Sequence, residues 1–260
     1  MTIESPCADI LVLAENGICT ITFNRVVKKN SLTGAMYQAL ASILQQAEAS
    51  SDVRVVLIQG DATVFSAGND LGDFLNGPQA DENAPPFQFL QALAAFPKPI
   101  VAAVCGPAVG IGTTMLLHCD LVYAGDNAMF VLPFINLGFC PEGASSLLLP
   151  QLMGHQRASE ALLLGEPFMA EAALEVGLVN RVVPPTECNT IAQAQARKLA
   201  AKPLASLLAS KKLLKSAQLP AVQARIAEEG RVFAELVQQP AAREAMRAFM
   251  EKRKPDFSKC

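Results

Sequence analysis

The stretch Pro99–Gly125, PIVAAVCGPAVGIGTTMLLHCDLVYAG, decides the fold of this chain. It opens with an apolar, β-branched run that ends at Gly106, passes through a turn with two further glycines, and closes with a second apolar run over 120–125. Short apolar runs bounded by glycine are typical of buried strands. The stretch therefore predicts a strand, a turn, a helix from about Gly112 and another strand, an alternation that indicates an α/β protein.

The same alternation continues toward the N-terminus. Strands are expected over 9–14 and 18–23, on either side of the turn signal Asn16-Gly17. A helix follows with Thr33 as its N-cap, and VRVVLIQG, residues 53–60, predicts a buried strand. The polar, proline-rich segment Asn76 to Pro86 predicts a surface loop and not a domain linker.

The composition changes after Pro203. From there the chain consists largely of Ala, Leu, Lys, Glu and Arg without a strand signal, which predicts helices broken near Gly230 and Pro240. We therefore expect an α/β core over residues 1–200 and a helical region over 201–260.

Composition and charge exclude several classes of protein. The chain of 260 residues is 51% hydrophobic and 17% charged, so global disorder is excluded. A net charge of -3 and the absence of Trp give no reason to expect a nucleic-acid or membrane-surface partner. The start lacks the pattern of a secretory signal, and the apolar run 100–117 is interrupted by Gly and Pro, so no membrane span is expected. The seven cysteines are scattered without a CxxC pair, which favours reduced thiols in a cytoplasmic protein.

Two glycine-rich turns are candidate anion sites. VFSAGNDL, residues 64–71, follows a strand, and such a turn leaves backbone N–H groups free to bind an oxyanion. The alternative is an ordinary turn in which Asn69 or Asp70 caps a helix. The second turn, Gly110-Ile111-Gly112, is an incomplete dinucleotide fingerprint, and no metal-ligand cluster is present in the sequence.

Glu142 is the only Asp, Glu, Lys or Arg between Asp126 and Arg157. Apolar surroundings raise the pKa of a carboxyl group and make it a good proton shuttle. The alternative is a charge that favours the N-terminus of a helix over 144–149. No GxSxG motif occurs, and with only His118 and His155 present, a serine-hydrolase mechanism is not favoured.

Taken together, six segments resemble the crotonase (enoyl-CoA hydratase/isomerase) superfamily over nearly the whole chain. They are FNRVVKKNSL (23–32), VFSAGNDL (64–71), KPIVAAVCGPAVGIGTTMLLHCDLVYA (98–124), LGFCPEGASSLLLPQLMG (137–154), AALEVGLVNRVVP (172–184) and AFMEKRKPDF (248–257). The resemblance implies a spiral of ββα units with a C-terminal helical region that forms a homotrimer or a dimer of trimers. It also implies an acyl-CoA thioester as substrate and no cofactor.

The resemblance assigns catalytic roles by motif position. The backbone N–H groups of Asn69 and Ile111 would hold the thioester oxygen of an enolate. Glu142 matches the PEG motif of the Δ3,Δ2-enoyl-CoA isomerase branch, whereas Thr114 and Phe134 stand where hydratases of the family carry their two glutamates. The expected reaction is therefore conversion of 3-enoyl-CoA to trans-2-enoyl-CoA in fatty-acid β-oxidation. Another crotonase-type enzyme, a hydratase or hydrolase, and a non-catalytic acyl-CoA-binding protein remain alternatives.

The resemblance also indicates where the substrate would bind, and it implies no metal site. We expect contacts at Lys29, Ser66, Ala67, Gly68, Asp70, Leu71, Gly110 and Phe134. The acyl pocket is expected to be shaped by Leu71, Phe74, Leu75 and the loop that follows. Further candidates for the CoA nucleotide are the basic tail residues Lys252, Arg253 and Lys254. The ending FSKC is close to a peroxisomal SKL tail, but Cys260 departs from it, and a cytoplasmic location is expected.

Overall fold

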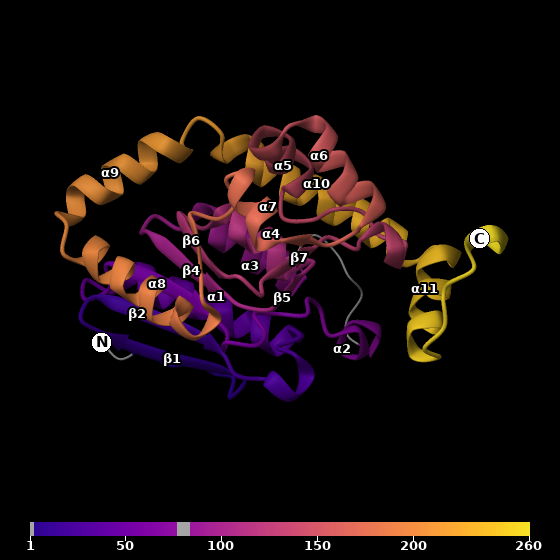
Figure 1. The fold of residues 1–260 in the computed structure, drawn as a ribbon, viewed down its shortest axis with the longest axis horizontal. Helices are drawn as coiled ribbons and strands as arrows, with labels where there is room; N and C mark the ends of the chain where they lie inside the picture. The colour runs from indigo at the N-terminus through magenta and orange to yellow at the C-terminus, as the bar shows by residue number, and fades with distance from the viewer. Residues whose placement is uncertain (1–2, 77–83) are drawn as a thin grey trace.

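The computed structural model describes residues 3–76 and 84–260 (Figure 1). Its main sheet has six strands in the order β1-β2-β3-β4-β6-β9. Only the β1–β2 pair is antiparallel; the other neighbours run parallel. The strands are β1 (Ile10–Glu15), β2 (Ile18–Phe23), β3 (Val55–Gln59), β4 (Ile100–Val104), β6 (Leu121–Gly125) and β9 (Arg181–Val183). The predicted β-hairpin is confirmed, and both turn residues have the positive φ that such a turn requires, 52° at Asn16 and 81° at Gly17.

Both faces of the central strands β2, β3, β4 and β6 are buried, which explains why these strands read as continuous apolar runs, whereas the edge strand β1 is largely exposed. Alternate residues of β3 and β4, such as Val56 and Ala102, pack with helices α1 (Gly34–Ala49) and α3 (Pro85–Ala95). The intervening residues, such as Leu57, pack against α8 (Pro185–Ala200) on the other face. Helix α1 begins as predicted, because the Thr33 side chain accepts a hydrogen bond from the Met36 backbone N–H.

A second sheet of three short strands was not predicted. It consists of β5 (Pro107–Val109), β7 (Met129–Val131) and β8 (Phe168–Met169). Because β4 is followed by β5 and β6 by β7, two successive turns of the chain each contribute one strand to each sheet before a helical segment, as expected for a spiral of ββα units. The helix predicted from Gly112 is short: α4 (Ile111–Thr114) passes directly into the 3-10 turn η2 (Met115–His118).

The C-terminal region is helical from α9 (Leu204–Lys215) through α10 (Leu219–Val237) to α11 (Pro240–Met250). The break at Pro240 is confirmed, but the prediction of a break at Gly230 is wrong. Gly230 lies inside α10, and a Cβ there would approach the Phe87 ring of α3 to 3.3 Å, so glycine allows the two helices to pack closely. In Figure 1, α9 and α11 extend at opposite sides of the α/β body.

The remaining elements connect these layers. They are η1 (Val26–Lys28), α2 (Leu71–Asn76), η3 (Ile135–Leu137), α5 (Ser145–Met153), α6 (His155–Ser159), the π-helical turn η4 (Glu160–Leu164), α7 (Ala170–Glu175) and η5 (Phe257–Lys259). All seven cysteines are free, and three of them, Cys19, Cys105 and Cys188, are buried. Within the described ranges, no helix has the length and apolar character needed to cross a membrane.

Candidate active site

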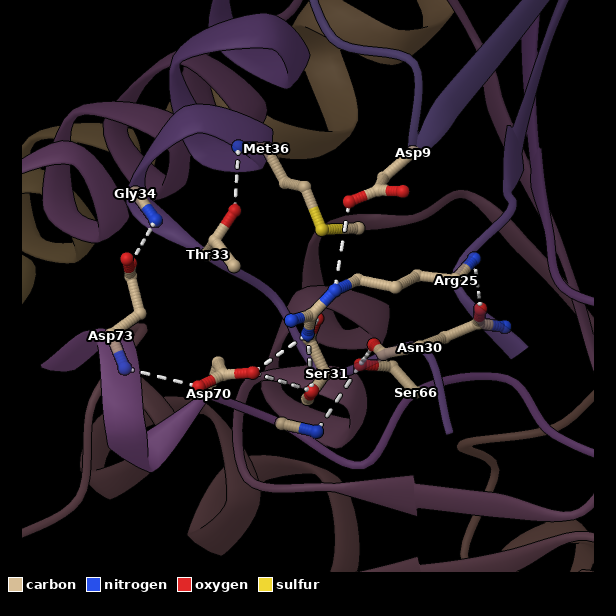
Figure 2. Close-up of polar contacts among 11 residues, drawn as sticks. Asp9, Arg25, Asn30, Ser31, Thr33, Gly34, Met36, Ser66, Asp70 and Asp73 are labelled. Carbon is tan, nitrogen blue, oxygen red and sulfur yellow. Dashed lines mark hydrogen bonds and ion pairs between the residues drawn. The ribbon is translucent and has the colours of Figure 1, made fainter. Parts of the chain in front are cut away.

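The loop before α1 holds the first glycine-rich turn in place (Figure 2). The Asn30 side chain donates hydrogen bonds to the carbonyl oxygens of Val64 and Phe65, at 3.3 and 3.1 Å. In return, the Ser66 hydroxyl donates to the Asn30 carbonyl oxygen at 2.9 Å. Asn30 has φ 52°, a left-handed conformation that asparagine tolerates better than most residues. The FNRVVKKNSL and VFSAGNDL segments therefore form one hydrogen-bonded unit.

An ion pair locks the far end of this turn. Arg25 donates to the Asp70 carboxylate at 2.7 Å, and the second Asp70 oxygen accepts from the Asp73 backbone N–H in the first turn of α2 at 3.0 Å (Figure 2). Burial alone raises the pKa of Asp70, but the hydrogen bonds from Arg25 and Asp73 outweigh it and lower the pKa below its ordinary value. The carboxylate of Asp70 is thus committed to holding the turn.

The second glycine-rich turn packs directly on the first. Ser66 N–H donates to the Pro107 carbonyl at 3.0 Å, and Val109 N–H donates to the Ser66 carbonyl at 2.9 Å. A Cβ at Gly112 would lie 2.9 Å from the Ser66 carbonyl oxygen, and a Cβ at Gly68 would lie 2.8 Å from that of Val109. Glycine is therefore required at both positions for the two turns to touch.

Each turn presents one backbone donor. Gly68 accepts from Leu32 N–H, and Asp70 N–H donates to the Leu32 carbonyl, both through bonds of 2.8 to 2.9 Å, so the peptide between them points its N–H away. That N–H belongs to Asn69, and its counterpart in the second turn is the N–H of Ile111, the first residue of α4. Among the described residues, neither amide has a hydrogen-bond acceptor. Both residues line the same cavity, so the pair can stabilise one oxyanion.

The cavity has a volume of about 660 Å³. Most of the expected substrate-binding residues border it: Lys29, Ala67, Gly68, Asp70, Leu71, Gly110 and Phe134. Ser66 does not border it, because this residue is fully buried and its hydroxyl contacts the backbone of Asn30 and Gly68. In the structure the Ser66 hydroxyl holds the turn, and contact of Ser66 with substrate stays a prediction.

Several lining residues were missed by the sequence reading. Lys28 precedes the expected Lys29, and the adjacent pair of lysines was a usable signal. Phe139, Phe233, Phe249 and Met250 come from the segment before α5 and from the C-terminal helices, and only the tertiary fold brings them to the cavity. The tail residues Lys252, Arg253 and Lys254 do not border it, and Arg253 is engaged with Glu244 and Glu251. The side chains of Phe74 and Leu75 and the residues 77–83 of the predicted loop lie outside the described part of the structure.

Glu142 is buried in the turn before α5, with 1% of its surface exposed. Glu142 and Thr114 both lie outside the lining of the cavity, whereas Ile111 borders it. The Thr114 hydroxyl donates to the Glu142 carboxylate at 3.2 Å, and Thr114 is the last residue of the short helix that begins at Ile111. The pKa of Glu142 is raised from 4.5 to about 8: burial is the largest cause, the Thr114 hydrogen bond opposes it in part, and the charge of Glu229 adds to it. A carboxyl group with this pKa can both accept and return a proton near neutral pH.

Two other buried groups surround this centre. Tyr37 of α1 donates a hydrogen bond to the Asn69 side-chain oxygen, and its pKa is raised well above the ordinary value by burial and by the charge of Glu142. His118 Nε2 lies 2.9 Å from the Gly143 carbonyl oxygen, and burial lowers the pKa of His118 to about 4, so the ring is neutral. Within residues 3–76 and 84–260, no group of three or more His, Cys, Asp or Glu side chains could hold a metal ion.

The fold and the paired turns together define a protein of the crotonase fold. The solved structure of Pseudomonas aeruginosa OdaA has a TM-score of 0.91 at 44% identity and covers 94% of this chain and 99% of its own. An enoyl-CoA hydratase/isomerase from Pseudoalteromonas atlantica has a TM-score of 0.91 at 38% identity, with 96% and 100% covered. The model of the Enoyl-CoA hydratase/isomerase family matches residues 13–259. The chain belongs to the enoyl-CoA hydratase/isomerase family.

Relatives within this family catalyse different reactions. Rat enoyl-CoA delta isomerase 2 is 39% identical over 79% of this chain, which spans 54% of that longer protein. The 2,3-dehydroadipyl-CoA hydratase of Escherichia coli is 34% identical, over 96% of this chain and 98% of its own. The 1,2-epoxyphenylacetyl-CoA isomerase of the same organism is 35% identical over the same shares, 96% and 98%. Similarity alone therefore leaves the reaction to be argued from the site.

Proposed function

We propose that this protein is a Δ3,Δ2-enoyl-CoA isomerase, which moves the double bond of a 3-enoyl-CoA to the trans-2 position. The observation that carries the proposal is the environment of Glu142: it is a buried carboxyl group with a pKa of about 8, and it is hydrogen-bonded to the hydroxyl of Thr114, which belongs to the helix that begins at Ile111. A 1,3-proton shift needs one such group and no co-reactant.

In the proposed reaction, the thioester oxygen accepts hydrogen bonds from the backbone N–H groups of Asn69 and Ile111. Glu142 in its carboxylate form removes a proton from C2, and the electron pair of the broken C–H bond moves into an enolate whose charge the two N–H groups stabilise. The proton then returns from the same carboxyl group to C4, while the double bond forms between C2 and C3. The enzyme ends in its starting protonation state, so the step balances.

The alternative of hydration is less well supported by the same positions. Adding water across a double bond requires a general base for the water and an acid for the carbon. Thr114 is fully buried with its hydroxyl directed at Glu142, and Phe134 offers only an apolar ring to the cavity. The geometry of these two residues thus favours proton transfer within the substrate over activation of water.

Substrate binding and assembly complete the proposal. Lys28 and Lys29 at the edge of the cavity are suited to the phosphates of a CoA ester, and the aromatic side chains to its acyl group. We expect no cofactor, and we propose that the reaction belongs to fatty-acid β-oxidation in the cytoplasm.

We also propose that the protein forms a homotrimer or a dimer of trimers. Leu213 and Leu214 of α9 are exposed to 79% and 81% and are suited to contact another subunit. Sedimentation at micromolar concentration tests this assembly, and a stable monomer would contradict it.

The test of the reaction is Glu142→Gln, assayed with a 3-enoyl-CoA by the absorbance of the conjugated product and with crotonyl-CoA for hydration. We expect a loss of isomerisation of roughly 100-fold or more, with acyl-CoA affinity nearly unchanged, because the backbone donors are untouched. Glu228→Gln, on the exposed side of α10, is the control. Isomerisation by the variant at more than about a tenth of the wild-type rate would refute the assignment. Wild-type hydration as fast as isomerisation would favour a hydratase, and binding without either reaction would indicate a non-catalytic acyl-CoA-binding protein.

A further inference from the structure

Glu229 of α10 is a second buried carboxylate close to the turn that carries Glu142. It is 5% exposed, and both of its oxygens accept hydrogen bonds from the start of α5. One oxygen accepts from the Ala144 backbone N–H at 2.6 Å, and the other accepts from the Ser146 backbone N–H at 3.1 Å and from the Ser146 hydroxyl at 2.5 Å. Donors on both oxygens at a helix N-terminus favour the ionised form of a carboxylate, whereas burial raises the pKa of Glu229 above its ordinary value.

The turn that Glu229 grips has an unfavourable backbone conformation. Gly143 and Ala144 both have positive φ, 69° and 56°, and a residue with a Cβ rarely adopts this conformation without support. The Ala144 N–H is one of the two amides that Glu229 holds. On the opposite side, the neutral His118 ring contacts the Gly143 carbonyl at 2.9 Å. The turn is therefore clamped between α10 and η2, two elements that come from distant parts of the chain.

We propose that Glu229 is a positioning residue for Glu142: it fixes the turn that carries Glu142 by accepting hydrogen bonds from the backbone amides of Ala144 and Ser146. This inference rests on the proposed role of Glu142 as the proton shuttle. It gives the C-terminal region an indirect part in the chemistry, because the residue that holds the turn lies on α10.

The charges around the pair are few, which allows the sign of the effect to be stated. The pKa of Glu142 responds to the charge of Glu229 and to the Thr114 hydroxyl. Tyr37 and the Cys140 thiol also lie near Glu142, and the charge of Glu142 raises the pKa of both groups. Arg225, which contacts the Ser146 hydroxyl at 3.2 Å, faces Glu229 from the same helix. Lys211 and Lys215 lie on the far side, near His118. Removing the charge of Glu229 therefore removes a negative neighbour and lowers the pKa of Glu142.

The experiment compares Glu229→Gln with the wild type and with Glu235→Gln. Glu235 is a glutamate of the same helix that is 64% exposed and paired with Arg231, so it is a matched control. For Glu229→Gln we expect kcat for 3-enoyl-CoA isomerisation to fall by about tenfold or more while KM changes by less than about threefold. We also expect the midpoint of the acidic limb of kcat/KM to move to lower pH. A merely structural residue would lower activity without moving this midpoint.

A second variant separates the clamp from the charge. Ser146→Ala removes one hydrogen bond to Glu229 and keeps the charge, so we expect a lower kcat with no downward move of the midpoint. A folded Glu229→Gln protein with wild-type kcat and midpoint would overturn the inference. If the Glu229→Gln variant does not fold, a wild-type kcat of the Ser146→Ala variant would overturn the inference that Glu229 positions the turn.

The two levels of the proposal fail differently. If the Glu142→Gln variant keeps its isomerase activity, the proposed function is refuted. If that variant is inactive while the Glu229→Gln variant behaves like the wild type, only the role of Glu229 is refuted.

Discussion

Burial of Glu142 should appear in the stability of the protein as well as in its activity. The folded state keeps this carboxyl group protonated up to about pH 8, whereas the unfolded chain releases the proton near its ordinary pKa of 4.5. Between these values the folded state binds one more proton than the unfolded state, so the contribution of this residue to stability falls as pH rises. Glu142→Gln has no proton to release and escapes this loss.

The magnitude follows from the two pKa values. A difference of one unit between the folded-state and unfolded-state pKa corresponds to about 1.4 kcal/mol. The free energy of unfolding of Glu142→Gln, relative to that of the wild type, should therefore increase by on the order of 4 kcal/mol between about pH 5 and pH 9. Comparing two pH values for the same pair of proteins cancels the fixed effect of the amide. The measurement is urea unfolding of both proteins across this range, in one buffer system at constant ionic strength.

A matched control fixes the interpretation. Glu228→Gln alters a glutamate whose side chain is 56% exposed, and its stability difference from wild type should change little with pH. A Glu142→Gln difference that stays constant within about 1 kcal/mol from pH 5 to pH 9 would refute the burial argument. An inactive variant that is more stable than the wild type at high pH is the combination expected of a catalytic group held in an unfavourable environment.

Three further predictions concern the centre itself. The kcat/KM for isomerisation should fall about tenfold per pH unit below a midpoint near pH 8, because Glu142 must be ionised to take the first proton; a flat profile down to about pH 6 would contradict this. Gly112→Ala should remove most of the activity, since its Cβ would lie 2.9 Å from the Ser66 carbonyl oxygen and push the two turns apart; full activity at unchanged KM would show that the turns need not touch. Tyr37→Phe removes the hydrogen bond to the Asn69 side chain and should lower kcat several-fold, with circular dichroism as the check that α1 is intact; wild-type kcat would show that the phenol does not hold the turn.

Local patterns predicted the parts of the fold that depend on local interactions. The apolar runs form β3, β4 and β6, because strands that are buried on both faces are apolar throughout. Thr33 caps α1, because a cap needs only one hydrogen bond from a nearby side chain. The strands of the small sheet are three, three and two residues long, too short to give a periodic signal. Gly230 was misread because its neighbour, the Phe87 ring, is 143 positions away in the sequence.

The candidate site divides in the same way. The two glycine-rich turns and the isolated Glu142 are visible in the sequence, because each is a local departure from its surroundings. The contact between the turns depends on hydrogen bonds that join Ser66 to residues of β5, a strand that the sequence did not reveal. Glu229 has no distinguishing signal at all, since one glutamate among several on an amphipathic helix reads as a solvated residue until the fold places it against α5.

The two donors of the site are main-chain amides, and this has a genetic consequence. An amide hydrogen is not encoded by any one side chain, so at positions 69 and 111 every amino acid but proline supplies it. The proposed acid-base function, in contrast, depends on a single carboxylate and can be lost by one nucleotide change. Mutation can therefore exchange the proposed chemistry at Glu142 while the two backbone donors pass unaltered to the descendants of this chain.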